Sequence, residues 1–284
     1  MSPWSSSRPP GLPRLCAAAA ASALLTLSGA AAAYHTDVDH ITDDTAWTLT
    51  GEKSFRLGLF KGSVTVADRL ELGTYVLPWA ALAPSVFAKA RFLSLGPSEW
   101  AVEGGLFHVD TGVFDRSGPT APVFTVGTLT LASSLRLAPR HQLSNNLVGT
   151  LVHGTGRIED STLQGTGEGA LTNLQYVGAY EYRISRTLAL VVTGRYRLLQ
   201  VLEAESDFTA QPDDYTSVDV ELAARGDQII NFSYAFSITP ALSWSWESFN
   251  LRLGVGYGNF NVPGVNFMID KRTPIPEFDL YWTF

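Results

Sequence analysis

The chain has 284 residues, a formal net charge of −7 at pH 7, 45% hydrophobic residues and 11% aromatic residues. The acidic balance argues against nucleic-acid binding, which needs a basic surface. The single cysteine excludes a disulfide scaffold and a thiolate zinc site. Beyond residue 34 no apolar run approaches the roughly 18 residues that a membrane-spanning helix needs, so helical membrane spanning is excluded.

Residues 1–33 have the pattern of a signal peptide. Arg8 and Arg14 provide the positive charge, the stretch LCAAAAASALLTLSGAAAA provides the apolar segment, and small residues end it. We expect export through the Sec pathway and cleavage after Ala33, which removes Cys16; an uncleaved anchor is the alternative. Residues 34–284 contain no linker or low-complexity tract, so we predict a single domain there.

The first third of this domain predicts short β-strands by alternation of apolar and polar residues. The stretch WTLTGEK (47–53) is a candidate first strand, and LPWAALAP (77–84) is a short helix, a loop or a strand edge. The clearer strand segments are SFRLGLF (54–60), RLELGTYV (69–76), FAKARFL (87–93), EWAVEGGLF (99–107) and FTVGTLTLASSLRL (124–137).

The rest of the chain alternates over longer stretches. Residues 171–201 predict two long strands joined by a tight turn at Ser185 and Arg186, with Arg195 opposite Gln175 across the pair. Residues 229–258 predict two more strands, with a break at Thr239 and Pro240.

Alternation of apolar and polar residues does not distinguish a soluble β-sandwich from a membrane β-barrel. The sandwich buries its apolar side chains inside, whereas the barrel exposes them to lipid on the outside. Strands of ten or more residues, aromatic residues near strand ends, and short turns alternating with long connections favour the barrel. The predicted tight turns are VADR (66–69), ISR (184–186) and ITPA (238–241). The predicted long connections are residues 108–120, 153–169, 203–227 and 258–276.

The last residues, FDLYWTF, resemble the C-terminal assembly signal of Gram-negative outer-membrane β-barrel proteins. Phe278, Leu280, Trp282 and Phe284 match its alternating apolar positions and terminal aromatic residue. The resemblance implies an all-β fold, an antiparallel transmembrane β-barrel in outer-membrane lipid. It also implies that the barrel assembly machinery reads the last strand, which pairs with the first. The length suggests about 12 strands, with ten as the alternative count.

On the predicted phasing, eight basic and four acidic side chains face the lumen. They are Arg56, Lys89, Arg91, Arg136, Arg183, Arg195, Arg197 and Arg252, with Glu71, Glu103, Glu181 and Asp279. A surplus of arginine in a water-filled space favours anions, so we predict a passive channel for small solutes with a basic lumen. The alternative is a non-conducting barrel with a structural or surface-interaction role, because arginine and glutamate also pair to fill small barrels.

One stretch raises catalysis as a minor alternative. RHQLSNN, with His141, Ser144, Asn145 and Asn146, superficially resembles the His-x-Ser-Asn signature of outer-membrane lipid hydrolases. The His–Ser spacing of three puts the two side chains on opposite faces of a strand, where the imidazole does not reach the hydroxyl. We therefore expect no enzyme activity and interpret the stretch as an exposed polar loop.

Two stretches raise metal binding, YHTDVDH near the N-terminus and FHVD in the first third of the domain. Their candidate ligands are His35, Asp37, Asp39, His40, His108 and Asp110. The first stretch opens the expected mature chain, where terminal residues are commonly disordered. We expect neither a metal nor a cofactor.

Overall fold

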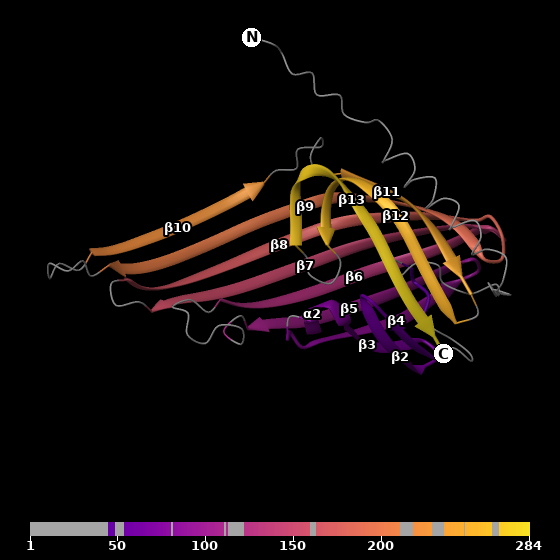
Figure 1. Ribbon diagram of the computed structural model, residues 1–284, viewed down its shortest axis with the longest axis horizontal. Coiled ribbons are helices and arrows are strands. Elements are labelled where there is room, and N and C mark those ends of the chain that lie inside the picture. Colours follow the sequence, from indigo (N-terminus) through magenta and orange to yellow (C-terminus); the bar gives the residue numbers. More distant parts are fainter. Residues whose placement is uncertain are drawn as a thin grey trace, which may run out of the picture.

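The structure, a computed structural model, describes residues 45–48, 54–80, 82–110, 112, 122–159, 163–210, 218–228, 236–246, 248–262 and 267–284. Almost all of them form strands (Figure 1). The elements are β1 (Phe55–Gly58), β2 (Lys61–Ala67), β3 (Leu70–Tyr75), α2 (Val76–Ala80), β4 (Ser85–Leu95), β5 (Ser98–Asp110), β6 (Val123–Ala138), β7 (His141–Glu159), β8 (Leu163–Arg183), β9 (Leu188–Ala210), β10 (Val218–Gln228), β11 (Phe236–Ser245), β12 (Phe249–Val262) and β13 (Phe267–Thr283). No helix in these ranges is long and apolar enough to span a bilayer.

The strands form one antiparallel sheet that closes on itself. Each strand pairs with its sequence neighbours, except that β10 and β11 both pair with β9 and have no described pairing with each other, and β1 pairs with β13. Strand β10 pairs with residues 200–210 of β9, and β11 pairs with residues 188–196 on the same edge. Together β10 and β11 therefore fill one strand position in the wall. The barrel therefore has 12 positions, which confirms the predicted fold and strand number.

The two faces of the wall are sorted as a membrane barrel requires. Large apolar side chains lie exposed on the outer face, among them Leu129, Leu151 and Val255. Polar and charged side chains on the opposite phase, such as Glu181 and Arg252, are buried inside. A soluble sandwich shows the reverse distribution, so this sorting identifies the chain as a β-barrel of the outer-membrane type.

The two rims differ in the length of their connections. One rim, here called the terminus-side rim, carries both ends of the barrel sequence and the turns at residues 68–69, 96–97, 139–140 and 184–187, as well as the connection between β11 and β12. Gly96 adopts a φ of +57° in one of these turns, a conformation that glycine adopts without strain. The opposite rim is uneven, because β6–β10 extend well beyond β1–β3 (Figure 1). The predicted turns VADR and ISR are confirmed.

The predicted turn ITPA is wrong. Thr239 and Pro240 lie inside β11, where Pro240 is opposite Val192 of β9. The described pairing with β12 pauses after Ile238 and resumes at Ala241 without a change of register. A proline lacks only one donor, and a strand tolerates it where that donor is not used. The connection to the next strand follows between Ser245, the end of β11, and Phe249, the start of β12.

Three predicted long connections are also wrong in large part. Strands β7, β8, β9, β10, β12 and β13 continue into the segments 153–169, 203–227 and 258–276. These extensions are rich in Gly, Thr and Glu, and their apolar alternation is lost where a strand leaves the membrane. The register of β8 with β9 differs as well, because the turn is longer than predicted: Gln175 lies opposite Arg197, and Arg195 lies opposite Val177.

In the N-terminal third, the structure decides between the alternatives for LPWAALAP and partly describes the candidate first strand WTLTGEK. Residues 76–80 of the LPWAALAP region form the helix α2. In WTLTGEK, Trp47 and Thr48 are described and are not in a strand, whereas residues 49–53 lie outside the described part. The first described strand is β1, four residues long.

A charge on the outer face is expected to destabilise the barrel. Leu129 is 61% exposed on the outer face of β6. Leu129→Arg should lower the free energy of unfolding by about 2–4 kcal/mol, the cost of arginine at the bilayer midplane. Thr130→Arg, one residue along and opposite Glu103 on the inner face, is the matched control and should cost much less. Urea titration in lipid vesicles measures both, and equal losses would contradict the face assignment.

Candidate functional site

The barrel interior is the candidate site, and the predicted lumen residues are placed there. Arg56, Lys89, Arg195, Arg197, Arg252, Glu71 and Glu181 are buried, each less than 10% exposed. The remaining predicted residues, Arg91, Arg136, Arg183, Glu103 and Asp279, are partly buried on the same inward phase. Their role in solute passage stays a prediction.

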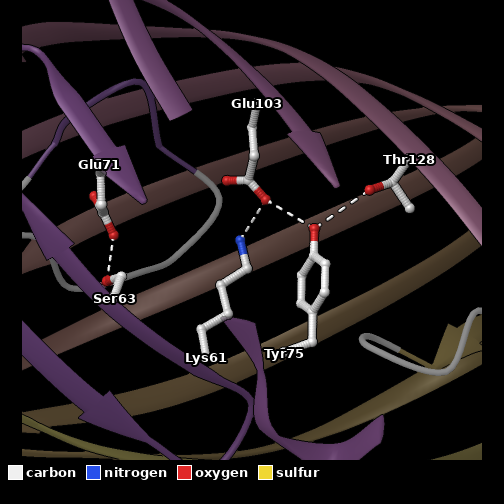
Figure 2. A network of polar contacts seen from close by, with 6 residues as sticks. All are labelled: Lys61, Ser63, Glu71, Tyr75, Glu103 and Thr128. Carbon is white, nitrogen blue, oxygen red and sulfur yellow. Dashed lines mark hydrogen bonds and ion pairs between the residues drawn. The ribbon is translucent and has the colours of Figure 1, made fainter. Parts of the chain in front are cut away.

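One polar network crosses the interior between β2, β3, β5 and β6 (Figure 2). Lys61 Nζ donates to Glu103 Oε1 at 2.7 Å, and the hydroxyl of Tyr75 donates to the same oxygen at 3.3 Å. The Tyr75 hydroxyl also lies 3.3 Å from Thr128 Oγ1. Ser63 Oγ donates to Glu71 Oε1 at 2.5 Å. These contacts tie the short N-terminal strands to the long wall behind them.

Lys89 lies between the two acids of this network. It is opposite Glu71 of β3 on one side and opposite Glu103 of β5 on the other. Opposite charges directly across strands stabilise the pairing. Three neighbouring strands thus carry an acid, a base and an acid on the inner face, and their charges compensate one another.

A second network joins β1, β9, β12 and β13. Arg252 Nη2 lies 2.5 Å from Glu277 Oε1 and also donates to Thr193 Oγ1 at 3.1 Å. Arg195 Nη1 is 3.9 Å from the other Glu277 oxygen. Arg56 is 3.7 Å from Asp279. Its guanidinium also lies 3.9 Å from the centroid of the Tyr281 ring, a cation–π contact. The network fills the terminus-side part of the interior.

Three charged residues that sequence reasoning missed belong to these contacts. Lys61 and Glu277 make the two closest ion pairs described above, and Glu99 lies 3.9 Å from Arg91. Lys61 was overlooked because it begins a strand directly after a turn, and Glu277 because it directly follows the segment 258–276, which was interpreted as a connection. The inward position of Glu99 could have been predicted, because it lies two residues before Ala101 and four before Glu103 on β5, and alternate residues share a face.

The segment Thr45–Thr48 lies inside the barrel near the terminus-side rim. Thr45, Ala46 and Thr48 are at most 2% exposed. Ala46 packs in one buried cluster with Ala101 of β5 and Ala132 of β6, and its N–H donates to Ser134 Oγ at 2.8 Å. The segment therefore occupies interior space, held by small side chains that leave room for it.

Next to it, the Arg136 guanidinium lies 5.8 Å from the centroid of the Trp47 ring. Thr48 Oγ1 donates to the backbone oxygen of Asp68 in the rim turn at 3.4 Å. These contacts anchor the segment Thr45–Thr48 at the terminus-side mouth. This position was not predicted, because Trp47 and Thr48 were assigned to a candidate first strand and not to the interior.

Towards the opposite rim, one side of the interior is apolar. Tyr75, Phe87, Phe107 and Val126 form a buried cluster, and Val109 and Val152 pack against it. We call these six residues the apolar cluster. The rings of Tyr75 and Phe87 are 5.3 Å apart, and Tyr75 and Phe107 meet edge to face at 6.5 Å. The aliphatic stem of Lys61 brings its ammonium to 5.0 Å from the Phe87 ring.

The stretch RHQLSNN is not the exposed loop that was predicted. It begins β7, with Ser144 and Asn146 buried inside the barrel. Ser144 Oγ is 2.9 Å from Ser134 Oγ. His141 lies on the opposite face, where its Nδ1 is 2.6 Å from the Tyr180 hydroxyl and its ring stacks on Tyr182. The strand thus separates the imidazole from the Ser144 hydroxyl.

The metal candidates are only partly described. His35, Asp37, Asp39 and His40 lie outside the described residues. His108 Nδ1 contacts Thr125 Oγ1 at 2.9 Å, and Asp110 accepts from the N–H of Gly112 at 2.9 Å. In the part of the chain that is described, no group of three His, Cys, Asp or Glu side chains is arranged to hold a metal ion.

No protein-family model and no curated protein matches the sequence significantly. The solved toluene transporter TodX of Pseudomonas putida aligns with a TM-score of 0.45 and 12% identity, over 90% of this chain and 73% of TodX. Outer-membrane expressed OmpT of Vibrio cholerae gives 0.32 and 12%, over 78% and 62%. CdiB from Acinetobacter baumannii gives 0.27 and 11%, over 81% and 60%. At this distance, function has to be argued from the residues of this chain.

Proposed function

We propose that this barrel is a passive, closable channel for small solutes in the outer membrane and not an enzyme. The observation that carries the proposal is the mostly polar lining of one side of the interior, in which Val177, Ala179, Ala189 and Val191 are the buried apolar residues of β8 and β9. The buried inward residues of β7–β9 include Gln142, Ser144, Asn146, Thr150, Asn173, Gln175, Thr193, Arg195, Arg197 and Gln200. They line the wall from the terminus-side rim outward.

The chemistry of this lining supports passage of polar solutes. An interior that only had to be filled would be more stable with apolar side chains, because each polar group removed from water costs free energy unless it is partnered. Amides, hydroxyls and guanidinium groups can exchange hydrogen bonds with water and with a passing solute. Arg195 and Arg197 make this side basic, which favours anions.

In this proposal, the conformation described here is the closed one. The segment Thr45–Thr48 and the network around Arg252 and Glu277 occupy the terminus-side part of the interior. Solute passage then requires the segment Thr45–Thr48 to move away, whereas the barrel wall stays in place. Such a change would have to break the hydrogen bond to Ser134, the packing on two alanines, the Arg136–Trp47 contact and the Thr48–Asp68 hydrogen bond. A single hydrogen bond contributes only about 0.5–1.5 kcal/mol.

The second candidate function is a non-conducting structural barrel. It is favoured by the compensated charges on β1–β5, where Lys61, Lys89 and Arg91 each lie against an acid. Such pairs can plug a small barrel permanently. The two functions differ in whether the refolded protein conducts ions.

Planar-bilayer conductance of the refolded protein, with the reversal potential under a KCl gradient, tests the proposal. We expect discrete channels with anion preference. Arg195→Glu/Arg197→Glu should reduce or reverse that preference, because it places two negative charges in the lining. Arg186→Glu/Arg140→Glu, on exposed residues of the terminus-side turns, is the control for charge outside the lumen. A folded, inserted barrel that never conducts would reject the channel in favour of the structural role.

A further inference from the structure

The barrel wall is unusually low at its N-terminal strands. Strands β1, β2 and β3 have four, seven and six residues. A strand needs about 9–11 residues to cross the apolar part of a bilayer. The turn between β1 and β2 therefore lies at the level of the membrane interior, whereas the neighbouring β13 continues for many residues beyond it (Figure 1).

One edge of β13 faces this low wall. Between Phe267 and Asp279, that edge has no described strand partner. Strand β1 pairs with Tyr281, Trp282 and Thr283, and its last described contact is the Leu59 N–H donating to the Leu280 oxygen. Such an edge is costly in a membrane, because unpaired N–H groups find no water there. An edge of this kind needs a local solution in the sequence.

Two prolines remove donors from this edge. The N–H and oxygen of Phe284 and the oxygen of Leu280 bond to β1, whereas the N–H of Thr283 bonds to the β12 side. The backbone N–H and C=O groups of even-numbered residues of β13 thus face the low wall. This alternation continues along the strand, because the register with β12 is unbroken from Trp282 to Thr273. Pro274 and Pro276 therefore present their nitrogen atoms to the open edge. Proline has no N–H, so neither position leaves an unsatisfied donor.

Apolar side chains line the other side of the same opening. The apolar cluster lies on the inner face of β3–β7, beginning with Tyr75 at the upper end of β3. Outside, α2 packs beside β2 and β4, with Trp79 51% exposed and the nearby Leu82 57% exposed. Exposed apolar side chains thus lie beside β2 and β4, and the buried apolar cluster begins at the end of β3.

We infer that the gap between β13 and the β1–β3 wall is a lateral window through which small apolar molecules pass between the barrel interior and the bilayer. A molecule that enters from the uneven rim meets the apolar cluster and leaves sideways into lipid. It does not cross the terminus-side mouth. The inference goes beyond the proposed ion-conducting path and is separable from it.

Uptake of an apolar dye whose fluorescence rises in bilayers, by cells that carry the full-length protein, is the test. Wild-type cells should take up the dye faster than cells without the barrel. The Ala46→Cys/Ala132→Cys variant, which tethers the segment Thr45–Thr48, should keep dye uptake although it loses ion conductance. Loss of both together would overturn the lateral window, because it would place the exit at the terminus-side mouth.

Two matched pairs of variants locate the path. Val152→Asp adds a carboxylate beside the apolar cluster and should slow dye uptake about tenfold, because an apolar molecule would have to displace its water. Val148→Asp, on the same face of the same strand, should not. Gly62→Trp places an indole on the low wall, where a Cβ meets nothing closer than 3.9 Å, and should slow uptake. Gly127→Trp, on the outer face of β6 with open space around it, is its control.

The outcomes separate the two proposals. Equal dye uptake in Val152→Asp and Val148→Asp, or in Gly62→Trp and Gly127→Trp, would reject the window. Ion conductance that is absent while the dye pattern holds would reject the proposed channel and leave the window standing. Heat-modifiable migration on gels checks that each variant has folded, and the two pairs serve as independent tests if one variant does not fold.

Discussion

The Ala46→Cys/Ala132→Cys variant is expected to lose most of its ion conductance under oxidising conditions and to regain it on reduction. Ala46 and Ala132 pack in one buried cluster, which makes this pair our choice for a disulfide between the segment and the wall. The bond would hold the segment Thr45–Thr48 in the mouth and remove the open state. We expect conductance to fall about tenfold or more, the size of effect that suppressing one of two states produces.

The control for this lock is a disulfide that does not tether the segment. Ala101→Cys/Ala132→Cys joins two residues that lie directly opposite each other on β5 and β6, within the same cluster. It adds the same chemistry at the same place but leaves the segment Thr45–Thr48 free. Equal conductance in the two oxidised variants would show that the segment does not close the channel.

Removing Arg252 is expected to be the most destabilising single change inside the barrel. Its guanidinium is buried and contacts Glu277 and Thr193. Arg252→Met leaves Glu277 with only the longer contact to Arg195, at 3.9 Å. Breaking a buried pair on one side costs about 3–5 kcal/mol, because the remaining charge has lost its partner out of water. Urea unfolding in lipid vesicles measures the loss.

The matching double variant tests the cause. Arg252→Met/Glu277→Met removes both charges and should recover a large part of the lost stability, because a buried pair can be replaced by apolar side chains at little cost. Arg186→Met, at an exposed turn position, controls for loss of an arginine as such. A double variant as unstable as the sum of its single changes would mean that the two residues act independently.

Strand faces could be predicted far better than strand ends. Alternation placed Tyr176 and Tyr180 outside and Gln175 and Glu181 inside, because only one phase can face lipid. It failed where the wall leaves the membrane, as in residues 203–210 of β9, because water on both faces imposes no apolar period. It also failed at Pro240, where a residue typical of turns sits within a strand whose missing donor is not needed.

In the candidate site, too, some features could be predicted from the sequence and others could not. The inward phase of Arg56, Lys89 and Arg195 followed from their strands, but their partners did not. Glu277 meets Arg195 and Arg252 because three strands come together at one level of the interior. The predicted count of interior charges left out one base, Lys61, and two acids, Glu99 and Glu277. The surplus of basic over acidic side chains is therefore smaller than predicted.

By itself, the sequence determined the membrane barrel, its two faces and its short-turn rim, because alternation and turn residues are local consequences of a strand between lipid and water. Only the tertiary structure decided what fills the barrel and where its wall is open. Two features depend on segments far apart in the chain: the place of Thr45–Thr48 beside Ser134, and the edge of β13 at Pro274 and Pro276, which has no partner among the described strands. Closing a barrel brings such segments together, and no local pattern records which of them meet.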